Sequence, residues 1–206
     1  VTPLAMLGVL VAAAWDLAGW ALAALMVLLQ GLAQWPFAIV SVATPALWVG
    51  TMGILGGIFL VARLPWWVRL LGLPLVLPVL LWQAPRPAAG EFELLAADIG
   101  QGSAVLVRTA GHTLVYDAGP RYSLESDAGH RVLVPLLRAL GERVDILMLS
   151  HSDLDHTGGA AAVLAMQPQA ALVSSLEDGH PWLASRVSTR CTAGQRWQWD
   201  GVVFEV

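Results

Sequence analysis

Charge is scarce in this sequence, and one kind of charged residue is missing altogether. Only 13% of the 206 residues are charged, about half of the ~25% found in soluble globular domains. Lysine is absent, and the 11 arginines are outnumbered by 15 acidic residues, which excludes the overall basic excess that marks many nucleic-acid-binding proteins. A single cysteine, Cys191, excludes an internal disulfide. A wholly soluble globular protein is therefore not expected.

The few charges are unevenly distributed along the chain. Residues 1–85 carry only Asp16, Arg63 and Arg69. All other charged residues lie between positions 86 and 206. This division predicts a membrane-embedded region followed by a soluble one.

The first region is predicted to belong to a multi-pass membrane domain. A helix needs ~20 apolar residues to cross the ~30 Å core of a bilayer. Four apolar segments are expected, at residues 4–15, 17–34, 46–62 and 66–82, and the first of them is too short to span. Tryptophans lie near most segment ends, where their rings would sit among the lipid headgroups.

Two arginines indicate the orientation of this region. Arg63 and Arg69 flank the short loop between the last two segments, and positive residues beside short loops stay in the cytoplasm. The chain after Trp82 is therefore predicted to face the periplasm or the cell exterior, from a protein of the inner membrane. Asp16, beside Trp15, is interpreted as an interfacial residue rather than as a functional acid within the membrane.

Glycines are concentrated in the third segment, at positions 50, 53, 56 and 57. Small residues allow helices to approach closely in lipid, so this segment is expected to pack against helices that the sequence does not contain. The chain begins at Val1, without the basic region or cleavage site of a signal peptide. We therefore expect a fragment of a longer protein, with residues 1–82 forming the C-terminal part of its membrane domain.

Residues 83–91, QAPRPAAGE, are predicted to be a linker because they combine two prolines and a glycine with the return of charge. The soluble domain is expected at residues 92–206. Short apolar runs predict strands at 92–97, 103–108, 113–117, 145–150 and 202–206, and the apolar spacing predicts helices at 130–141 and 158–166. This mixture indicates a layered α/β or α+β domain.

The segment SHSDLDHTGG contains the densest group of potential metal ligands. His151, Asp153, Asp155 and His156 follow residues 146–149, which are apolar throughout and predict a strand covered on both faces. Open α/β sheets bind ligands just past the ends of such strands. A divalent cation would neutralise the carboxylates and use the imidazole lone pairs. We therefore predict a metal site; in the simpler alternative, the aspartates cap the next helix and the histidines are merely exposed.

Two ions are expected at this site rather than one. Asp155 and His156 are adjacent, so their side chains should diverge and reach different ions, while His151 and Asp153 serve one of them. Two metal ions ~3.5 to 4 Å apart can activate a bridging water and stabilise a leaving oxygen. Such a pair suits the hydrolysis of a phosphodiester or of another ester.

The same segment resembles the metallo-β-lactamase superfamily, whose pattern is H-x-H-x-D-H. His151, Asp155 and His156 match its first, third and fourth positions, and Asp153 replaces the second histidine. This exchange makes the donor set richer in oxygen, leaves zinc, manganese and magnesium open, and argues against a standard zinc β-lactamase. The resemblance implies an αββα fold, of which residues 92–206 would be the N-terminal half, and a catalytic role for Asp155.

Two further segments narrow the resemblance. ADIGQGSAVLV at 97–107 and LVYDAGP at 114–120 are similar to the lactamase-like domain of the ComEC competence proteins. This similarity implies a channel that takes up one strand of transforming DNA, other competence proteins as partners, and an attached metal-dependent hydrolase of nuclease type. It also implies that Asp117 orients the metal loop from outside the ligand set. The remaining ligands would come from later loops, so this chain alone is expected to be inactive; homo-oligomerisation stays open.

Several nearby residues are given no part in the chemistry. Asp98 is interpreted as a turn residue, and Gly100 and Gly102 as a tight turn with positive φ. Ser150 is not expected to form a triad with His151, because adjacent side chains on an extended chain point apart. Three further histidines are expected simply at the surface: His112, His130 and His180.

Two other functions stay open at this point. The chain could belong to a membrane-anchored hydrolase of the same superfamily that acts on a small ester or a lipid instead of DNA. It could also belong to a membrane component whose lactamase-like domain only binds or scaffolds. Ester hydrolysis without DNA cleavage would favour the first function, and a continuation lacking the later ligands would favour the second.

Overall fold

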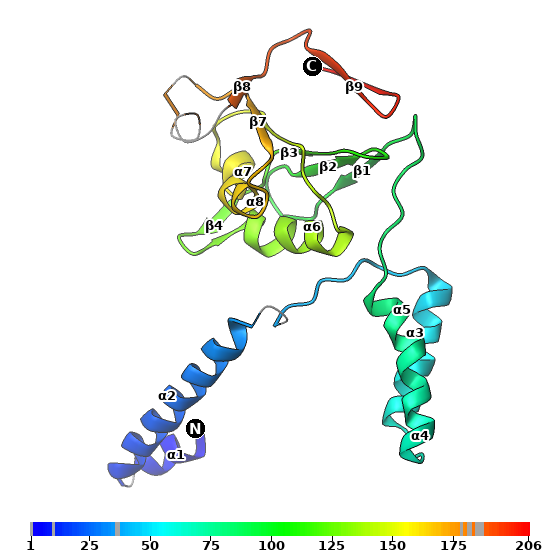
Figure 1. Ribbon diagram of the computed structural model, residues 1–206. Helices are drawn as coiled ribbons and strands as arrows, with labels where there is room; N and C mark the ends of the chain where they lie inside the picture. Colours follow the sequence, from blue (N-terminus) through cyan, green and yellow to red (C-terminus); the bar gives the residue numbers. More distant parts are fainter. Residues whose placement is uncertain (1, 10, 36–37, 178, 181–182, 184–187) are drawn as a thin grey trace. The chain divides into compact units, whose positions relative to one another are not determined.

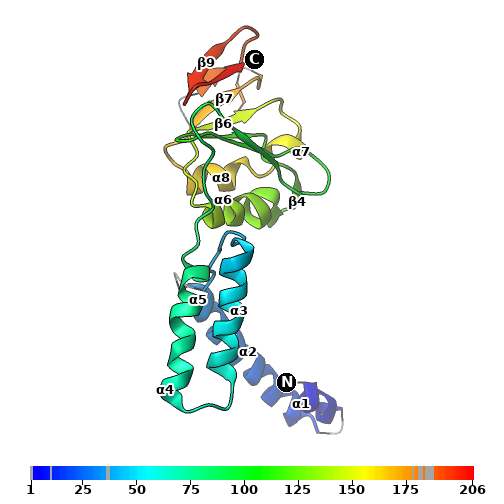
Figure 2. The same ribbon diagram turned by 90° about the vertical axis from the view of Figure 1, so that its right-hand side faces the viewer.

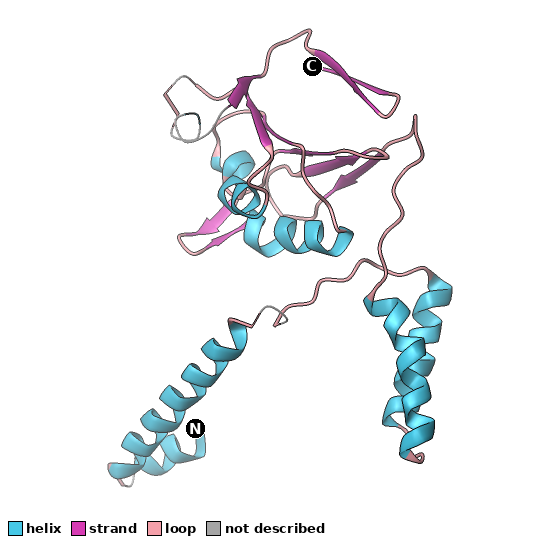
Figure 3. Ribbon diagram, in the orientation of Figure 1, coloured by secondary structure: helices cyan, strands magenta, loops and turns pink. Residues whose placement is uncertain are grey.

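The computed structural model describes residues 2–9, 11–35, 38–177, 179–180, 183 and 188–206 (Figure 1). The chain divides into two compact units, Val1–Val40 and Ser41–Val206. Helices make up the regular structure of the first unit in its described residues, and the second unit contains helices and all the strands (Figure 3). The boundary predicted at 83–91 lies within the second unit and remains a prediction.

The first unit consists of α1 (Thr2–Gly8) and α2 (Ala13–Ala33). Among the described residues, α2 is the one helix that is long and apolar enough to cross a membrane. The break between the first two apolar segments, expected beside Asp16, lies instead between Gly8 and Ala13. Asp16 is therefore in the first turn of α2, where the helix dipole favours a carboxylate.

The last two apolar segments form helices that pack side by side (Figure 2). One is α3 (Leu47–Val61); the other consists of α4 (Trp66–Arg69), a short 3-10 turn η1 (Leu70–Gly72) and α5 (Leu73–Leu80). Pro74 lies in the first turn of α5, where the missing N–H of proline is tolerated. Both helices are in the range of 10–17 residues, which is shorter than the ~20 residues of a full span.

Two of the clustered glycines in α3 face this neighbouring helix. A Cβ atom at Gly56 would lie 2.7 Å from the carbonyl oxygen of Gly72, and one at Gly53 would overlap the side chain of Val79. The close approach therefore requires glycine at both positions. For these two glycines the partner is the chain's own next helix and not a helix outside the sequence, whereas the space beside Gly57 is open.

A mixed sheet of six strands forms the centre of the α/β domain (Figure 1). The order is β1-β2-β3-β6-β7-β8; β2 is antiparallel to its neighbours β1 and β3, and β3, β6, β7 and β8 are parallel. The six strands are β1 (Glu93–Ala96), β2 (Val105–Arg108), β3 (Thr113–Tyr116), β6 (Ile146–Leu149), β7 (Ala171–Ser174) and β8 (Ser188–Arg190). A small hairpin of β4 (Arg121–Ser123) and β5 (Ser126–Asp127) follows β3.

Helices cover one face of this sheet (Figure 2). The helical segments of the domain are η2, a π-helical turn (Gly129–Leu133), α6 (Val134–Leu140), α7 (Leu154–Thr157) and α8 (Ala160–Met166). The core contains alternate residues of the strands, among them Leu106, Val115, Leu147, Leu149 and Leu172. The strand β6 lies between β3 and β7. Leu147 and Leu149, on one face, are 0% exposed, and Met148, on the other, is 7% exposed, so the predicted strand covered on both faces is confirmed at these positions.

The other face of the sheet is only partly covered. A hairpin of β9 (Arg196–Trp199) and β10 (Val202–Glu205) lies over it. Met148, Val173 and Trp197 line a cavity of about 490 Å³ between this hairpin and the sheet. Leu94 remains 60% exposed, so apolar sheet surface is left uncovered.

The five predicted strands and two predicted helices of this domain are confirmed, with ends that differ by one or two residues. Five strands, β4, β5, β7, β8 and β9, were not expected from the sequence. The most consequential of them is β7, because its pairing completes the burial of β6.

A buried ionic cluster lies where β3 and β6 begin. Glu142, which is 6% exposed, accepts a hydrogen bond at 2.8 Å from Nε of Arg108, which is 2% exposed. Its other oxygen accepts one at 2.8 Å from Nη1 of Arg86. Arg86 belongs to the predicted linker and also donates to the carbonyl oxygens of Thr109 and His112. Residues 83–91 form no helix or strand, but the side chain of Arg86 anchors them to the domain.

Candidate metal centre

The polar segment begins where β6 ends, at the opposite end of the strand from the ionic cluster. Because β3 and β6 are parallel, the residues that follow β3 reach the same edge of the sheet. The amide of Asp117 donates to the carbonyl oxygen of Met148 at 2.8 Å, and the amide of Ala118 donates to that of His156 at 2.7 Å. Two segments that are distant in the sequence therefore build this edge together.

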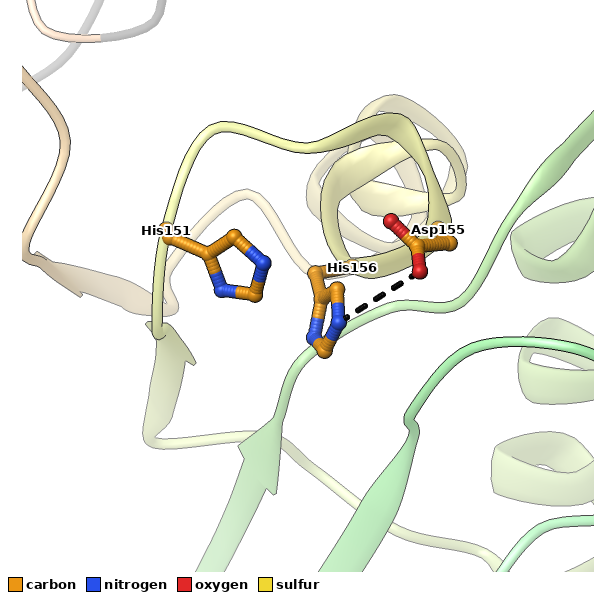
Figure 4. Close-up of side chains that lie close together, drawn as sticks. All are labelled: His151, Asp155 and His156. Atoms are coloured by element: carbon orange, nitrogen blue, oxygen red, sulfur yellow. Dashed lines mark ion pairs between the residues drawn. The ribbon is translucent and has the colours of Figure 1, made fainter.

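Three of the four predicted ligands lie close together here (Figure 4). One potential ligand atom from each of His151, Asp155 and His156 lies within 4.8 Å of the others. The centroids of the two imidazole rings are 3.9 Å apart. The side chains of His151 and Asp155 are 46% and 52% exposed, and that of His156 is 21% exposed. The group is thus accessible from solvent at one edge of the domain.

Asp155 and His156 converge, although adjacent side chains were expected to diverge. Nε2 of His156 lies 3.6 Å from Oδ2 of Asp155, as the dashed line in Figure 4 marks. Both residues belong to α7, a single helical turn. The expected divergence is wrong, because the ends of the two side chains approach each other although the residues are adjacent in the sequence.

Asp153 stands apart from this group of three. It immediately precedes α7, its side chain is 71% exposed, and its Oδ2 lies 3.4 Å from Nε2 of His151. Its carboxylate makes no capping hydrogen bond to α7. The alternative in which Asp153 serves only as a helix cap is therefore not supported.

Asp117 lies behind the cluster, and its side chain is 1% exposed. Its Oδ2 is 2.7 Å from Nδ1 of His156, and its Oδ1 accepts a hydrogen bond from the amide of Ser150 at 2.8 Å. The residue has a positive φ of 56°, which is uncommon outside glycine and is tolerated best by Asp and Asn. The buried carboxylate therefore contacts the imidazole of His156 directly, in addition to the backbone amide of Ser150.

Ser150 contacts His151, contrary to the expectation from the sequence. Its hydroxyl oxygen lies 2.8 Å from Nδ1 of His151 and 2.9 Å from Oδ2 of Asp117. The prediction that adjacent side chains point apart was wrong; it assumed an extended chain, whereas β6 ends at Leu149, before both residues. Sequence reasoning missed Ser150, and its position between a buried strand and the first histidine was the available signal.

A glycine turn supports α7 from the other side. Gly100 and Gly102 have positive φ values of 79° and 112°, as predicted. A Cβ atom at Gly102 would overlap the carbonyl oxygen of Asp155, and the amide of Ser103 donates to that oxygen at 3.2 Å. The second glycine is thus required for close approach to the metal loop, and not only for the turn. Asp98 is exposed and lies outside the group of potential ligands.

The other histidines lie outside the cluster. His130 is 69% exposed and pairs with Asp127 at 2.9 Å, which confirms a surface position. His112 is stacked on Trp199 with ring centroids 4.8 Å apart, so it packs against the β9–β10 hairpin as well as facing solvent. Cys191 is free.

The donor set fits a divalent metal ion. In both clustered histidines Nδ1 is engaged by the protein, whereas Nε2 faces a carboxylate. Metal-ligating histidines characteristically use one ring nitrogen for the ion and the other for an orienting partner. Imidazole nitrogen and carboxylate oxygen together suit zinc or manganese. His151, Asp155 and His156 are therefore the residues that would hold an ion.

Known proteins resemble part of this chain. The chain is 40% identical over 124 residues to "Competence protein ComA" of Neisseria gonorrhoeae, a match that covers 58% of this chain and 16% of that protein. It is 35% identical over 109 residues to "Recombination protein 2" of Haemophilus influenzae, covering 53% of this chain and 13% of that protein. A further relative is "Uncharacterized protein YcaI" of Escherichia coli, 34% identical over 124 residues, which are 60% of this chain and 15% of that protein.

The chain thus spans only 13% to 16% of the length of these relatives. The resemblance to competence proteins expected from the sequence is confirmed by the similarity to one of them. The family model of the metallo-beta-lactamase superfamily matches residues 97–200, which make up half of the chain and include the metal loop. Together with the mixed α/β fold, this match shows that the chain belongs to the metallo-beta-lactamase superfamily.

Proposed function

We propose that this chain belongs to an inner-membrane protein for the uptake of transforming DNA and carries its metal-dependent phosphodiesterase domain, of nuclease type. The similarity to relatives named as a competence protein and a recombination protein supports the DNA substrate. The observation that the proposal depends on most is the convergence of His151, Asp155 and His156 at an accessible edge of the sheet. A nucleic acid strand needs such an open site because it cannot enter a closed pocket.

The proposed ligands are His151, Asp153, Asp155 and His156, with Asp155 also acting in catalysis. Bound zinc, manganese or magnesium would supply Lewis-acid polarisation of a phosphate oxygen and an activated water. We propose two ions, since each imidazole Nε2 has its own carboxylate neighbour, at 3.4 Å for Asp153 and 3.6 Å for Asp155. Asp117 would orient the loop from behind, through His156.

The membrane arrangement is part of the same proposal. Residues 1–82 would form the C-terminal part of a multi-pass domain, 83–91 a linker, and 92–206 the hydrolase region on the periplasmic side. The apolar helices α2, α3 and α5 support this division. One DNA strand would pass through the channel of the whole protein, which would work with other competence proteins and could form homo-oligomers. The chain on its own is proposed to bind metal without cleaving DNA.

The proposal is tested on the gene product expressed at full length and purified in detergent. We expect release of nucleotides from single- or double-stranded DNA that requires Mn²⁺ or Zn²⁺ and is lost in His156→Ala. His130→Ala is the matched control, because His130 is exposed and outside the cluster. Hydrolysis of a carboxylic ester with DNA left intact would overturn the proposal in favour of an ester hydrolase. Absence of metal-dependent cleavage of either substrate would favour a scaffold.

A further inference from the structure

A single buried carboxylate is hydrogen-bonded toward both histidines of the cluster. Oδ2 of Asp117 lies 2.7 Å from Nδ1 of His156 and 2.9 Å from the hydroxyl oxygen of Ser150. The same hydroxyl lies 2.8 Å from Nδ1 of His151. Its distance to Nδ1 of His156 is longer, at 3.4 Å. A continuous path of short contacts therefore leads from Asp117 through Ser150 to His151.

The direction of each hydrogen bond in this path follows from the number of protons available. An ionised carboxylate only accepts hydrogen bonds, and a serine hydroxyl has one proton to donate. Asp117 Oδ2 must therefore receive the proton of Ser150, since two acceptors facing each other at 2.9 Å beside a side chain that is 1% exposed would be strongly unfavourable. With that proton committed, the hydroxyl oxygen can only accept from His151. Nδ1 of His151 is then the donor.

In His156 the proton is also on Nδ1, because this nitrogen contacts Asp117 directly. Its Nδ1 faces the carboxylate oxygen directly, so Nδ1 must donate there as well. In the neutral form, both imidazoles then carry the proton on Nδ1 and leave the lone pair of Nε2 free. In each ring Nε2 is the nitrogen that faces a carboxylate of the cluster, Asp153 for His151 and Asp155 for His156.

We propose that Ser150 is a positioning residue that transmits the orienting effect of Asp117 to His151, so that one carboxylate selects the Nδ1–H tautomer of both histidines. Neutral imidazole otherwise exchanges between two tautomers, and only the Nδ1–H form offers Nε2 to an ion. Selecting this form before the ion arrives removes a rearrangement from the binding step. The inference rests on the proposed function in so far as the two imidazoles are taken to be ligands.

The tautomers can be read directly from the chain in detergent, before any metal is added. With ¹⁵N-labelled histidine, long-range ¹H–¹⁵N spectra distinguish the Nδ1–H from the Nε2–H form for each of the five histidines. We expect the Nδ1–H form for His151 and His156 in the unaltered chain. In Ser150→Ala, His151 should lose this preference while His156 keeps it. Ser150→Thr, which retains the hydroxyl, should restore it.

Metal binding provides a second measurement on the same variants. Removal of a residue that orients a metal ligand costs about 10- to 100-fold in metal affinity, and we expect the lower end for Zn²⁺ binding to Ser150→Ala, with Ser150→Thr close to the unaltered chain. Ser152→Ala is the matched control, because Ser152 is an exposed serine of the same loop. Unperturbed His156 signals would show that the variants keep the fold of the site.

Two results would overturn the inference. One is the Nε2–H form at His151 in the unaltered chain, which needs no variant to fold. The other is a Ser150→Ala variant in which both the tautomer of His151 and the Zn²⁺ affinity are unchanged. Failure of the proposed function would look different. A chain that binds no Zn²⁺ would contradict the proposed function, but the tautomers of its histidines could still be measured.

Discussion

Oδ2 of Asp153 lies 3.4 Å from Nε2 of His151, at the position where the superfamily pattern has a second histidine. The loop therefore contributes two carboxylates and two imidazoles instead of one carboxylate and three imidazoles. Oxygen-rich donor sets favour manganese and magnesium, whereas imidazole favours zinc. The presence of Asp153 beside His151, in place of a third imidazole, is thus expected to affect which ion the site prefers.

Replacing Asp153 by histidine should shift the metal preference toward zinc. We expect the ratio of Zn²⁺ to Mn²⁺ affinity to rise by about tenfold in Asp153→His, because one oxygen donor is exchanged for a nitrogen donor. Competition titrations with a chromophoric chelator measure both affinities. Glu125→His adds a histidine at an exposed acidic position of the β4–β5 hairpin and serves as the control. An unchanged ratio in Asp153→His would show that residue 153 does not ligate the ion.

Asp117→Asn tests whether the buried carboxylate matters to the ligands. The carboxylate faces three donors, from Ser150 N, Ser150 Oγ and His156 Nδ1, and an amide with a single oxygen leaves at least one of them without an acceptor. Zn²⁺ affinity should fall by about 10- to 100-fold. Because Asn tolerates the positive φ of 56° at this position, the backbone is retained. Asp98→Asn, at an exposed position, should leave Zn²⁺ affinity unchanged, and equal affinities in the two variants would contradict the role of Asp117.

The sequence predicted those parts of the structure that local pattern determines. The apolar run of 146–149 and the ligand-rich residues after it were sufficient to place a buried strand and a polar edge, both of which the structure contains. The strand β7 was missed because its four residues, ALVS, are short and lack alternation. The β9–β10 hairpin carried a stronger signal, since Asp200 and Gly201 form its two-residue turn with φ values of 50° and 87°.

The internal geometry of the site could not be predicted in the same way. Neither the approach of Asp155 to His156 nor the contact between Ser150 and His151 follows from residue type and spacing. Both follow from tertiary contacts, such as the packing of Gly102 against the carbonyl oxygen of Asp155. Residue types and spacing identified the candidate ligands, but the side-chain directions required the fold.

Removal of Glu142 should strongly destabilise the α/β domain. Its side chain pairs with Arg108, which is 2% exposed, so Glu142→Ala leaves this buried guanidinium with Glu93, which is 46% exposed, as its remaining carboxylate partner. Breaking a buried ion pair in this way costs about 3 to 5 kcal/mol. Hydrogen exchange of peptides covering β2 and β3, measured by mass spectrometry on the chain in detergent, gives the change in the free energy of opening. Glu125→Ala, at an exposed position, should leave the free energy of opening unchanged. Hydrogen exchange in Glu142→Ala that is as slow as in the unaltered chain would show that other groups bind the guanidinium of Arg108.

Asp200 should make the attachment of the β9–β10 hairpin dependent on pH. A hydrogen bond from the hydroxyl of Thr109, at 2.7 Å, and one from the amide of Gly111, at 2.6 Å, lower the pKa of Asp200 below its ordinary value of 3.8. The folded state therefore favours the carboxylate, and this contribution is present above the ordinary pKa and is lost as the pH falls through the lowered one. Asp200→Asn keeps the turn conformation but removes the charge. We expect the amide of Gly111 to exchange faster in Asp200→Asn than in the unaltered chain at neutral pH, with the difference vanishing below the lowered pKa. A difference that persists or grows in acid would contradict the assignment of the effect to the ionised carboxylate.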